Sequence, residues 1–101
     1  MTFGLDEKTC QRVLGVFKKY PSIQKAVIFG SRALGTYRPQ SDIDIAIFGE
    51  TGAGLEGRLR QDLDALSTPY LFDVVHYSLI ENEQLKEHID RRGKMFYEKP
   101  Q

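Results

Sequence analysis

The 101-residue sequence has little of several features that mark common protein classes. It has a single cysteine, Cys10, so an internal disulfide is excluded, and this usage favours a reducing compartment. It shows neither an N-terminal apolar signal region nor an apolar run of about 18 residues, so we expect a cytoplasmic protein that does not cross a membrane. Charge of one sign is not in excess either, since 14 basic residues balance 14 acidic ones. A long nucleic acid or a membrane surface is therefore not an expected partner.

The hydrophobic content of 41% is enough for one compact domain, which we expect to span residues 1–101. Apolar residues recur at three- and four-residue steps in some segments, as in helices, and form short β-branched runs or alternate in others, as in strands. Pro21 is expected to stop the first helix, and Gly93 the last. The pattern predicts helices over 6–20, 55–66 and around Leu85 and Ile89, strands over 25–30, 42–48 and 70–77, and a short strand or docked tail over 94–99.

Two carboxylates stand one residue apart in the second predicted strand. In a strand, the side chains of Asp42 and Asp44 would point to the same face, with Cα atoms about 6 to 7 Å apart. Their mutual repulsion, roughly 2 to 3 kcal/mol at an effective dielectric constant near 20, would become attraction around a divalent cation. Hard oxygen ligands suit Mg²⁺. Taken alone, the D-x-D pattern is also explained by a solvated strand face.

A glycine and a serine follow the first predicted strand. Gly30 ends the strand, and Ser31 opens a segment long enough for one helical turn before Gly35. Such a turn lets backbone amides approach a phosphate, and the serine hydroxyl adds a donor. The pattern is therefore typical of a phosphate cradle, although a Gly-Ser pair alone is more often an ordinary turn. It is not a P-loop, because the G-x-x-x-x-G-K-[ST] pattern is missing.

The spacing between these two elements is more specific than either one. Ten residues separate Gly30-Ser31 from Asp42-Ile43-Asp44. This spacing matches the GS-x10-D-x-D signature of the DNA polymerase beta-like nucleotidyltransferase superfamily, and "GSRALGTYRPQSDIDI" closely resembles its minimal nucleotidyltransferase branch. The segment "YLFDVVHY" supplies Asp73, which matches the family's third carboxylate, and "HIDRRGKMFYE" resembles the ending of these small proteins. The resemblance implies an α+β fold, with a small mixed β-sheet and helices packed on it.

The resemblance also implies roles for the matching residues. Gly30 and Ser31 would hold the β- and γ-phosphates of a nucleoside triphosphate. Asp42 and Asp44 would bind two Mg²⁺ ions that bridge the phosphates, and Asp73 would complete the second metal site. In two-metal catalysis, one ion activates the attacking hydroxyl and the other stabilises the leaving pyrophosphate. Whether Asp73 is a metal ligand, a general base or both is left open.

Three further residues are candidates for nucleotide binding. Arg32 and Arg38 have guanidinium groups that can clamp phosphate oxygens, although a solvated surface arginine is an equal alternative for each. Ser41 is expected to cap or orient the turn before Asp42. Active relatives often carry a second arginine at the position of Leu34, and this difference bears on how strongly phosphate is bound.

Proteins of the minimal branch are often paired with a separate helical protein of the HEPN type. The resemblance therefore implies a two-component transferase or the antitoxin of a toxin–antitoxin pair, as a homo- or hetero-oligomer. The expected activity is transfer of a nucleoside monophosphate, AMP from ATP, to a hydroxyl acceptor. The alternative is a non-catalytic antitoxin or scaffold that binds nucleotide and acts by binding its helical partner. The exposed part of "MFY", Met95 to Tyr97, is a candidate docking patch, with core packing as the alternative.

Overall fold

A computed structural model describes residues 3–36, 38, 42–49, 54–66 and 68–100. The helices are α1 (Glu7–Lys18), α2 (Ser31–Leu34), α3 (Leu55–Asp64) and α4 (Glu83–Arg92), with a short 3₁₀ turn, η1 (Tyr77–Leu79). The strands are β1 (Ile23–Phe29), β2 (Ile43–Gly49), β3 (Phe72–His76) and β4 (Lys94–Glu98). No helix in these residues is both long enough and apolar enough to span a membrane.

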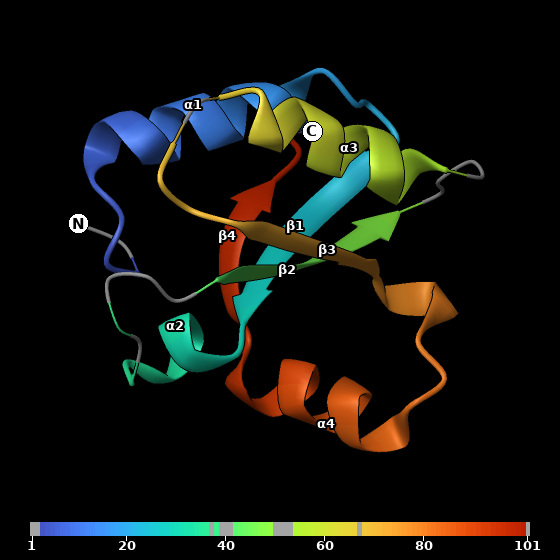
Figure 1. Cartoon of the computed structure of the whole chain (residues 1–101). Helices are drawn as coiled ribbons and strands as arrows, with labels where there is room; N and C mark the ends of the chain where they lie inside the picture. The colour runs from blue at the N-terminus through green and yellow to red at the C-terminus, as the bar shows by residue number, and fades with distance from the viewer. Residues whose placement is uncertain (1–2, 37, 39–41, 50–53, 67, 101) are drawn as a thin grey trace.

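The four strands form one mixed sheet in the order β3-β2-β1-β4. β1 pairs antiparallel with both β2 and β4, whereas β2 and β3 run parallel. A parallel pair needs a crossover connection, and α3 supplies it. Figure 1 shows α1 and α3 on one face of the sheet and α4 on the other. The predicted α+β fold with a small mixed sheet is thus confirmed.

Local sequence explains where the longer helices begin and end. α1 starts after Asp6, whose Oδ1 accepts a hydrogen bond from the Thr9 amide at 2.7 Å. α4 starts after Asn82, whose Oδ1 accepts from the amides of Gln84 and Leu85. Side chains of this type satisfy amides that have no partner within the helix.

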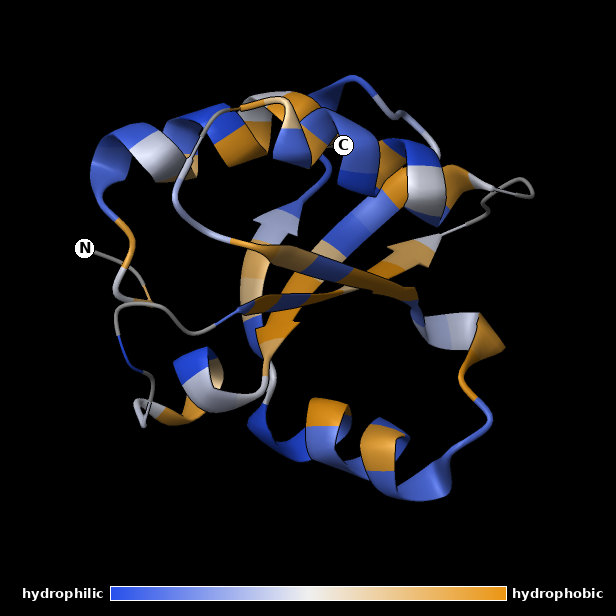
Figure 2. Cartoon of the chain, in the orientation of Figure 1, coloured by the Kyte–Doolittle hydropathy of each residue, from blue (hydrophilic) through white to orange (hydrophobic). Residues whose placement is uncertain are grey.

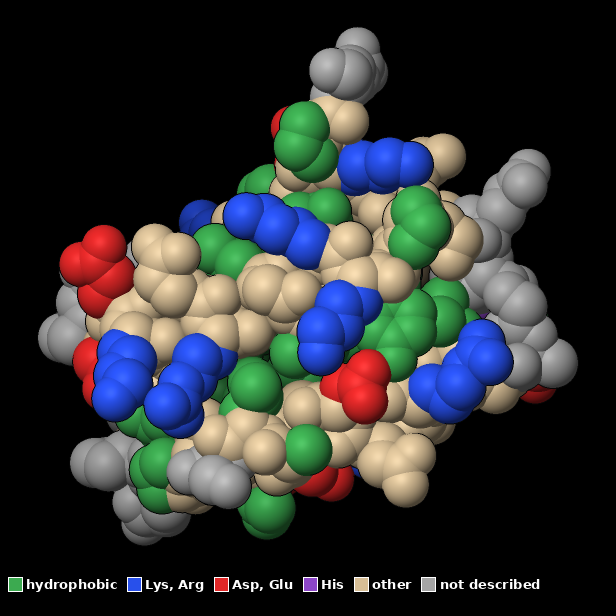
Figure 3. Space-filling view, turned by 90° about the horizontal axis from the view of Figure 1, so that it is seen from above, with side chains coloured by type: hydrophobic (Ala, Val, Ile, Leu, Met, Phe, Trp, Pro, Cys, Tyr) green, Lys and Arg blue, Asp and Glu red, His purple; other side chains and the backbone are tan. Residues whose placement is uncertain are grey.

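The face of the sheet under α1 and α3 holds the main hydrophobic core. Alternate residues of β2, Ile43, Ile45 and Ile47, are fully buried there together with Phe17 of α1 and Leu59 of α3. Figure 2 shows apolar residues along the strands and polar residues over much of the outward sides of the helices. On the outer surface of this layer, Lys and Arg side chains lie among acidic, polar and hydrophobic ones (Figure 3).

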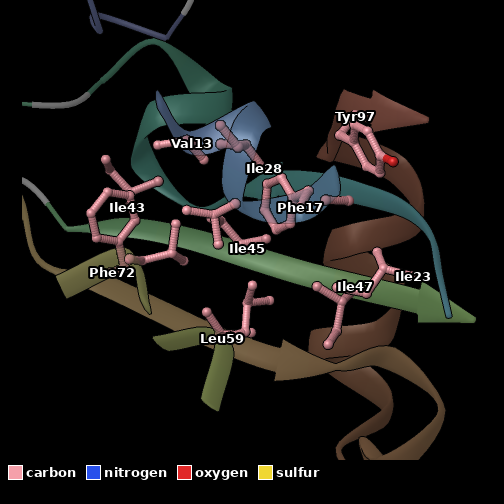
Figure 4. Packing of buried hydrophobic residues seen from close by; sticks show 14 of the residues in the cluster. Val13, Phe17, Ile23, Ile28, Ile43, Ile45, Ile47, Leu59, Phe72 and Tyr97 are labelled. Atoms are coloured by element: carbon pink, nitrogen blue, oxygen red, sulfur yellow. The ribbon is translucent and has the colours of Figure 1, made fainter. Parts of the chain in front are cut away.

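Aromatic rings close the core at its β4 side. Phe17 stacks on Tyr97 with ring centroids 5.5 Å apart and meets Phe96 edge-on at 6.2 Å. Figure 4 shows Phe17 among the isoleucines of β1 and β2, with Tyr97 beside it. The segment 94–99 therefore contributes a strand, and of the candidate docking patch only Met95 is largely exposed.

The opposite face has a smaller cluster. Val27, Phe29 and Ala46 of the sheet pack against Ile89 of α4, and Leu85 joins them at the margin. Because neighbouring residues of a strand point to opposite faces, Asp44 lies on this side of β2. The second face therefore combines a small apolar cluster with charged positions.

Two details of the fold differ from the sequence-based prediction. β1 starts at Ile23, two residues before the predicted 25–30, because Ile23 is fully buried and pairs with Gly49. β2 starts at Ile43, so Asp42 precedes the strand. Cys10 is partly buried against the core.

Candidate active site

Two predicted carboxylates lie on neighbouring strands. Asp44 of β2 is in register with Asp73 of β3, and Ile43 with Phe72. Phe72 belongs to the core under α3, so Asp73 points to the opposite face, the same side as Asp44. The parallel pairing thus brings together residues that are 29 positions apart in the chain.

Asp44 is the electrostatic centre of this group. Partial burial raises the pKa of its carboxyl above the ordinary value, and the negative charges of Asp73 and Asp42 raise the pKa further. His88 acts in the opposite direction. These interactions place Asp42 and Asp73 within electrostatic reach of Asp44.

The Gly-Ser turn lies directly against Asp44. β1 ends opposite this residue, since Phe29 pairs with Asp44, and Gly30 follows with φ of 77°. A Cβ atom at Gly30 would collide with the Asp44 carboxylate. Only glycine fits both the backbone conformation and the space. Ser31 then begins α2, as the sequence predicted.

His88 contacts the same turn. The Gly30 amide donates a hydrogen bond to Nε2 of His88 at 3.0 Å, and the His88 ring meets Phe29 edge-on. The sequence analysis did not single out this histidine, and 58 residues separate it from Gly30. No local spacing could have predicted the contact, because it depends on how α4 packs on the sheet.

Arg60 is a second residue that the sequence did not single out. Its Nη2 lies 2.6 Å from Oδ1 of Asp73, with the two side chains 49% and 51% exposed. The third carboxylate is therefore paired with a cation from α3. The sequence offers only a weak signal for Arg60: it is a charged residue next to the buried Leu59. Many surface helices have such a residue, so the pattern does not indicate a functional role.

Arg32 is buried, at 2% exposure, and the alternative of a solvated surface arginine is therefore wrong. Its Nη1 donates to the Phe3 carbonyl at 2.8 Å, and its guanidinium lies over the Tyr70 ring at 5.0 Å. These contacts tie α2 to the N-terminal segment and to the approach to β3. A nucleotide contact by Arg32 stays a prediction.

The remaining candidates lie at the margin of the group. Asp42 is exposed just before β2, and Arg38 is exposed on the connection from α2. Ser41 lies outside the described residues. Leu34, at the position where active relatives often carry arginine, is 47% exposed at the end of α2.

The donor chemistry at this position fits a hard divalent cation. Asp42, Asp44 and Asp73 offer only carboxylate oxygens, and their mutual repulsion is what a Mg²⁺ ion would relieve. In the conformation described, however, no three Asp, Glu, His or Cys side chains of the described residues form a ready ligand group. Asp73 is held by Arg60 instead.

The sheet, the glycine turn and the paired carboxylates define a class of protein, the small nucleotide-transferring domains built on a mixed sheet. The model of the family described as polymerase beta, nucleotidyltransferase, matches residues 11–101, and the chain belongs to this family.

Solved structures agree with this assignment. A crystal structure of a toxin–antitoxin with AMP-PNP is 26% identical, with a TM-score of 0.71, and the match covers 94% of this chain and 75% of that one. The toxin–antitoxin MntA-HepT is 20% identical, with a TM-score of 0.67 and coverages of 93% and 74%. The structure of a tri-AMPylated Shewanella oneidensis HEPN toxin in complex with MNT antitoxin contains a chain that is also 20% identical to this one. The TM-score is 0.68, and the match covers 94% of this chain and 74% of that one. The last two show the shared fold. Comparison with curated proteins gave no match.

Proposed function

We propose that this chain is a Mg²⁺-dependent nucleotidyltransferase that moves AMP from ATP to a hydroxyl group of a separate helical protein of the HEPN type. The observation that carries the proposal is that Asp44 is in register with Asp73 and lies directly against Gly30. Gly30 can come this close to the Asp44 carboxylate because it has no Cβ atom. The candidate metal ligands and the candidate phosphate-binding turn therefore lie next to each other. The family assignment and the relative with AMP-PNP support the same activity.

Each residue then has a defined task. Gly30 and Ser31 hold the outer phosphates of ATP at the start of α2, where the Ser31 hydroxyl donates to a phosphate oxygen and Gly30 lets the backbone come close. Asp42 and Asp44 hold the metal ions, and Asp73 completes the second site, accepts the proton of the acceptor hydroxyl, or does both. When bound, two Mg²⁺ ions supply charge neutralisation at the phosphates and activation of the hydroxyl. Arg32, Arg38 and Ser41 are assigned to nucleotide contacts.

A separate acceptor protein follows from the geometry that transfer requires. In-line displacement needs the acceptor oxygen held about 3 to 3.5 Å from the α-phosphorus, and such positioning supplies several kcal/mol of the barrier. The site lies at the start of β2 and β3, where Asp42 and Asp73 are exposed, so an acceptor carried by another protein can reach it. The toxin–antitoxin relatives, one of them a complex with an AMPylated HEPN toxin, support a protein acceptor.

The experiment combines the chain with a HEPN-type protein from the same organism, Mg²⁺ and each α-labelled nucleoside triphosphate. Intact-mass spectrometry of the HEPN-type protein reports a nucleoside-monophosphate increment directly. We expect the increment with ATP, and almost no transfer by the isolated chain. Efficient transfer to a small molecule by the chain alone would contradict the two-component proposal.

A second function from another class is a nucleotide-binding antitoxin or scaffold without catalysis. The Arg60–Asp73 ion pair favours it, because it removes the third carboxylate from the group, and so does the exposed Leu34 in place of an arginine. In this case the HEPN-type protein binds tightly but gains no increment with any triphosphate. The same mass measurement, with a binding assay beside it, separates the two functions.

A further inference from the structure

We propose that Arg60 is a built-in substitute for the metal: its guanidinium neutralises Asp73 in the free chain and leaves this carboxylate when a divalent cation binds. The inference rests on the proposed function, in which Asp73 is a metal ligand. It makes Arg60 a positioning residue that sets how readily the metal site forms.

The position of Arg60 makes this pairing unusual. Its neighbour Leu59 is buried in the core under α3, while Asp73 points to the opposite face of the sheet. β3 is the last strand in the sheet order, and Nη2 of Arg60 nevertheless lies 2.6 Å from Oδ1 of Asp73. Packing of α3 on the core does not itself require this contact.

The electrostatics explain why a cation is needed there. Asp44 is in register with Asp73 on the neighbouring strand, and both carboxylates lie on the same face of the sheet. The Nη2 group of Arg60 donates a hydrogen bond to Oδ1 of Asp73, which a neighbouring carboxylate cannot do when it is ionised. Arg60 therefore gives Asp73 a positive partner of the kind that a bound metal ion would supply.

The exposure of the pair makes the exchange feasible. Both side chains are about half exposed, at 49% and 51%. Ion pairs with this degree of solvent contact contribute little to stability, so a divalent cation competes with the arginine at low cost. Removing Arg60 should consequently strengthen metal binding, whereas removing a ligand should weaken it.

The test compares Arg60→Ala with Arg58→Ala, an exposed arginine two residues earlier on α3. Mn²⁺ binding to the full chain without nucleotide is measured by electron paramagnetic resonance, and Mg²⁺ binding by calorimetry, at fixed ionic strength. We expect Arg60→Ala to bind both ions about two- to fivefold more tightly, the range given by a half-exposed ion pair. Arg58→Ala should match the wild type, and Arg60→Lys, which keeps the charge, should lie between the wild type and Arg60→Ala.

Equal affinities in the two alanine variants, or weaker binding in Arg60→Ala, would overturn the inference. Asp44→Asn separates this failure from a failure of the proposed function. If Asp44→Asn loses Mn²⁺ binding while Arg60→Ala behaves like Arg58→Ala, only the inference fails. If Asp44→Asn binds Mn²⁺ as the wild type does, or the wild type binds none, the metal site itself is wrong. Thermal melts check folding, and Arg60→Gln replaces Arg60→Ala if the latter is unfolded.

Discussion

The two faces of the sheet are built for different purposes. The face under α1 and α3 buries isoleucines from three positions of β2 together with aromatic residues. The face toward α4 has a smaller apolar cluster and holds Asp44, Asp73 and the Gly-Ser turn. Stability is thus concentrated on one side, which allows repelling carboxylates to be tolerated on the other.

The largest expected effect lies in the closed core. Phe17→Ala removes a fully buried ring that contacts Phe96 and Tyr97, and we expect the free energy of unfolding to fall by about 3 to 5 kcal/mol. Leu85→Ala, at the margin of the α4 cluster, should cost less than half as much, because Leu85 is only partly buried. Urea denaturation measures both. Equal losses would contradict the difference between the faces.

Substitutions on the face that holds the candidate site should instead weaken ligand binding and leave the protein folded. Asp42→Asn combined with Asp44→Asn removes the main charged ligands, and we expect the affinity for Mg-ATP to fall by at least about a hundredfold, more than is usual for residues outside the ligand shell. The thermal melt should change little, since the substitutions also relieve repulsion. Calorimetric titration beside the melt tests both halves. Undiminished metal-dependent binding by the folded variant would remove the site assignment.

A smaller change is expected at the phosphate cradle. Ser31→Ala should weaken ATP binding by about 1.5 to 3 kcal/mol, the contribution of one hydrogen bond to a charged group. AMP binding should weaken less, because the cradle is assigned to the outer phosphates. Ser22→Ala, before β1 at the far end of this strand, is the matched control. Equal losses for ATP and AMP would place Ser31 elsewhere in the site.

The smallest effect concerns pH. The raised pKa of Asp44 means that its carboxyl group binds a proton more tightly in the folded state than in the unfolded chain. The ionised carboxylate therefore lowers the free energy of unfolding at neutral pH. Asp44→Asn should therefore melt slightly above the wild type at pH 7 with EDTA present. The difference should shrink as the pH falls through the raised pKa toward the ordinary value of about 4. A wild type more stable than Asp44→Asn at pH 7 would refute the assignment.

The sequence predicted the parts of this architecture that depend on local pattern. Asp6 and Pro21 bracket α1, and the spacing from Gly30 to Asp44 predicted a turn that faces a carboxylate. Long-range pairing was out of reach: nothing local decides whether 94–99 is a strand, because its partner is β1, some 70 residues earlier. Arg60 and His88 were missed for the same reason, since each reaches the site through the packing of a helix.

The strand order also determines how firmly each carboxylate is held during fluctuations of the native state. β2, which carries Asp44, is hydrogen-bonded to a strand on both sides, whereas β3, which carries Asp73, has β2 as its one neighbour in the sheet order. Backbone amides at the centre of a sheet exchange with deuterium mainly through large openings, and those of a border strand through small ones. Amides of β2 should therefore be among the slowest to exchange and those of β3 faster. Asp44 then lies on a rigid central strand, whereas Asp73 lies on a strand that can open locally without unfolding the protein.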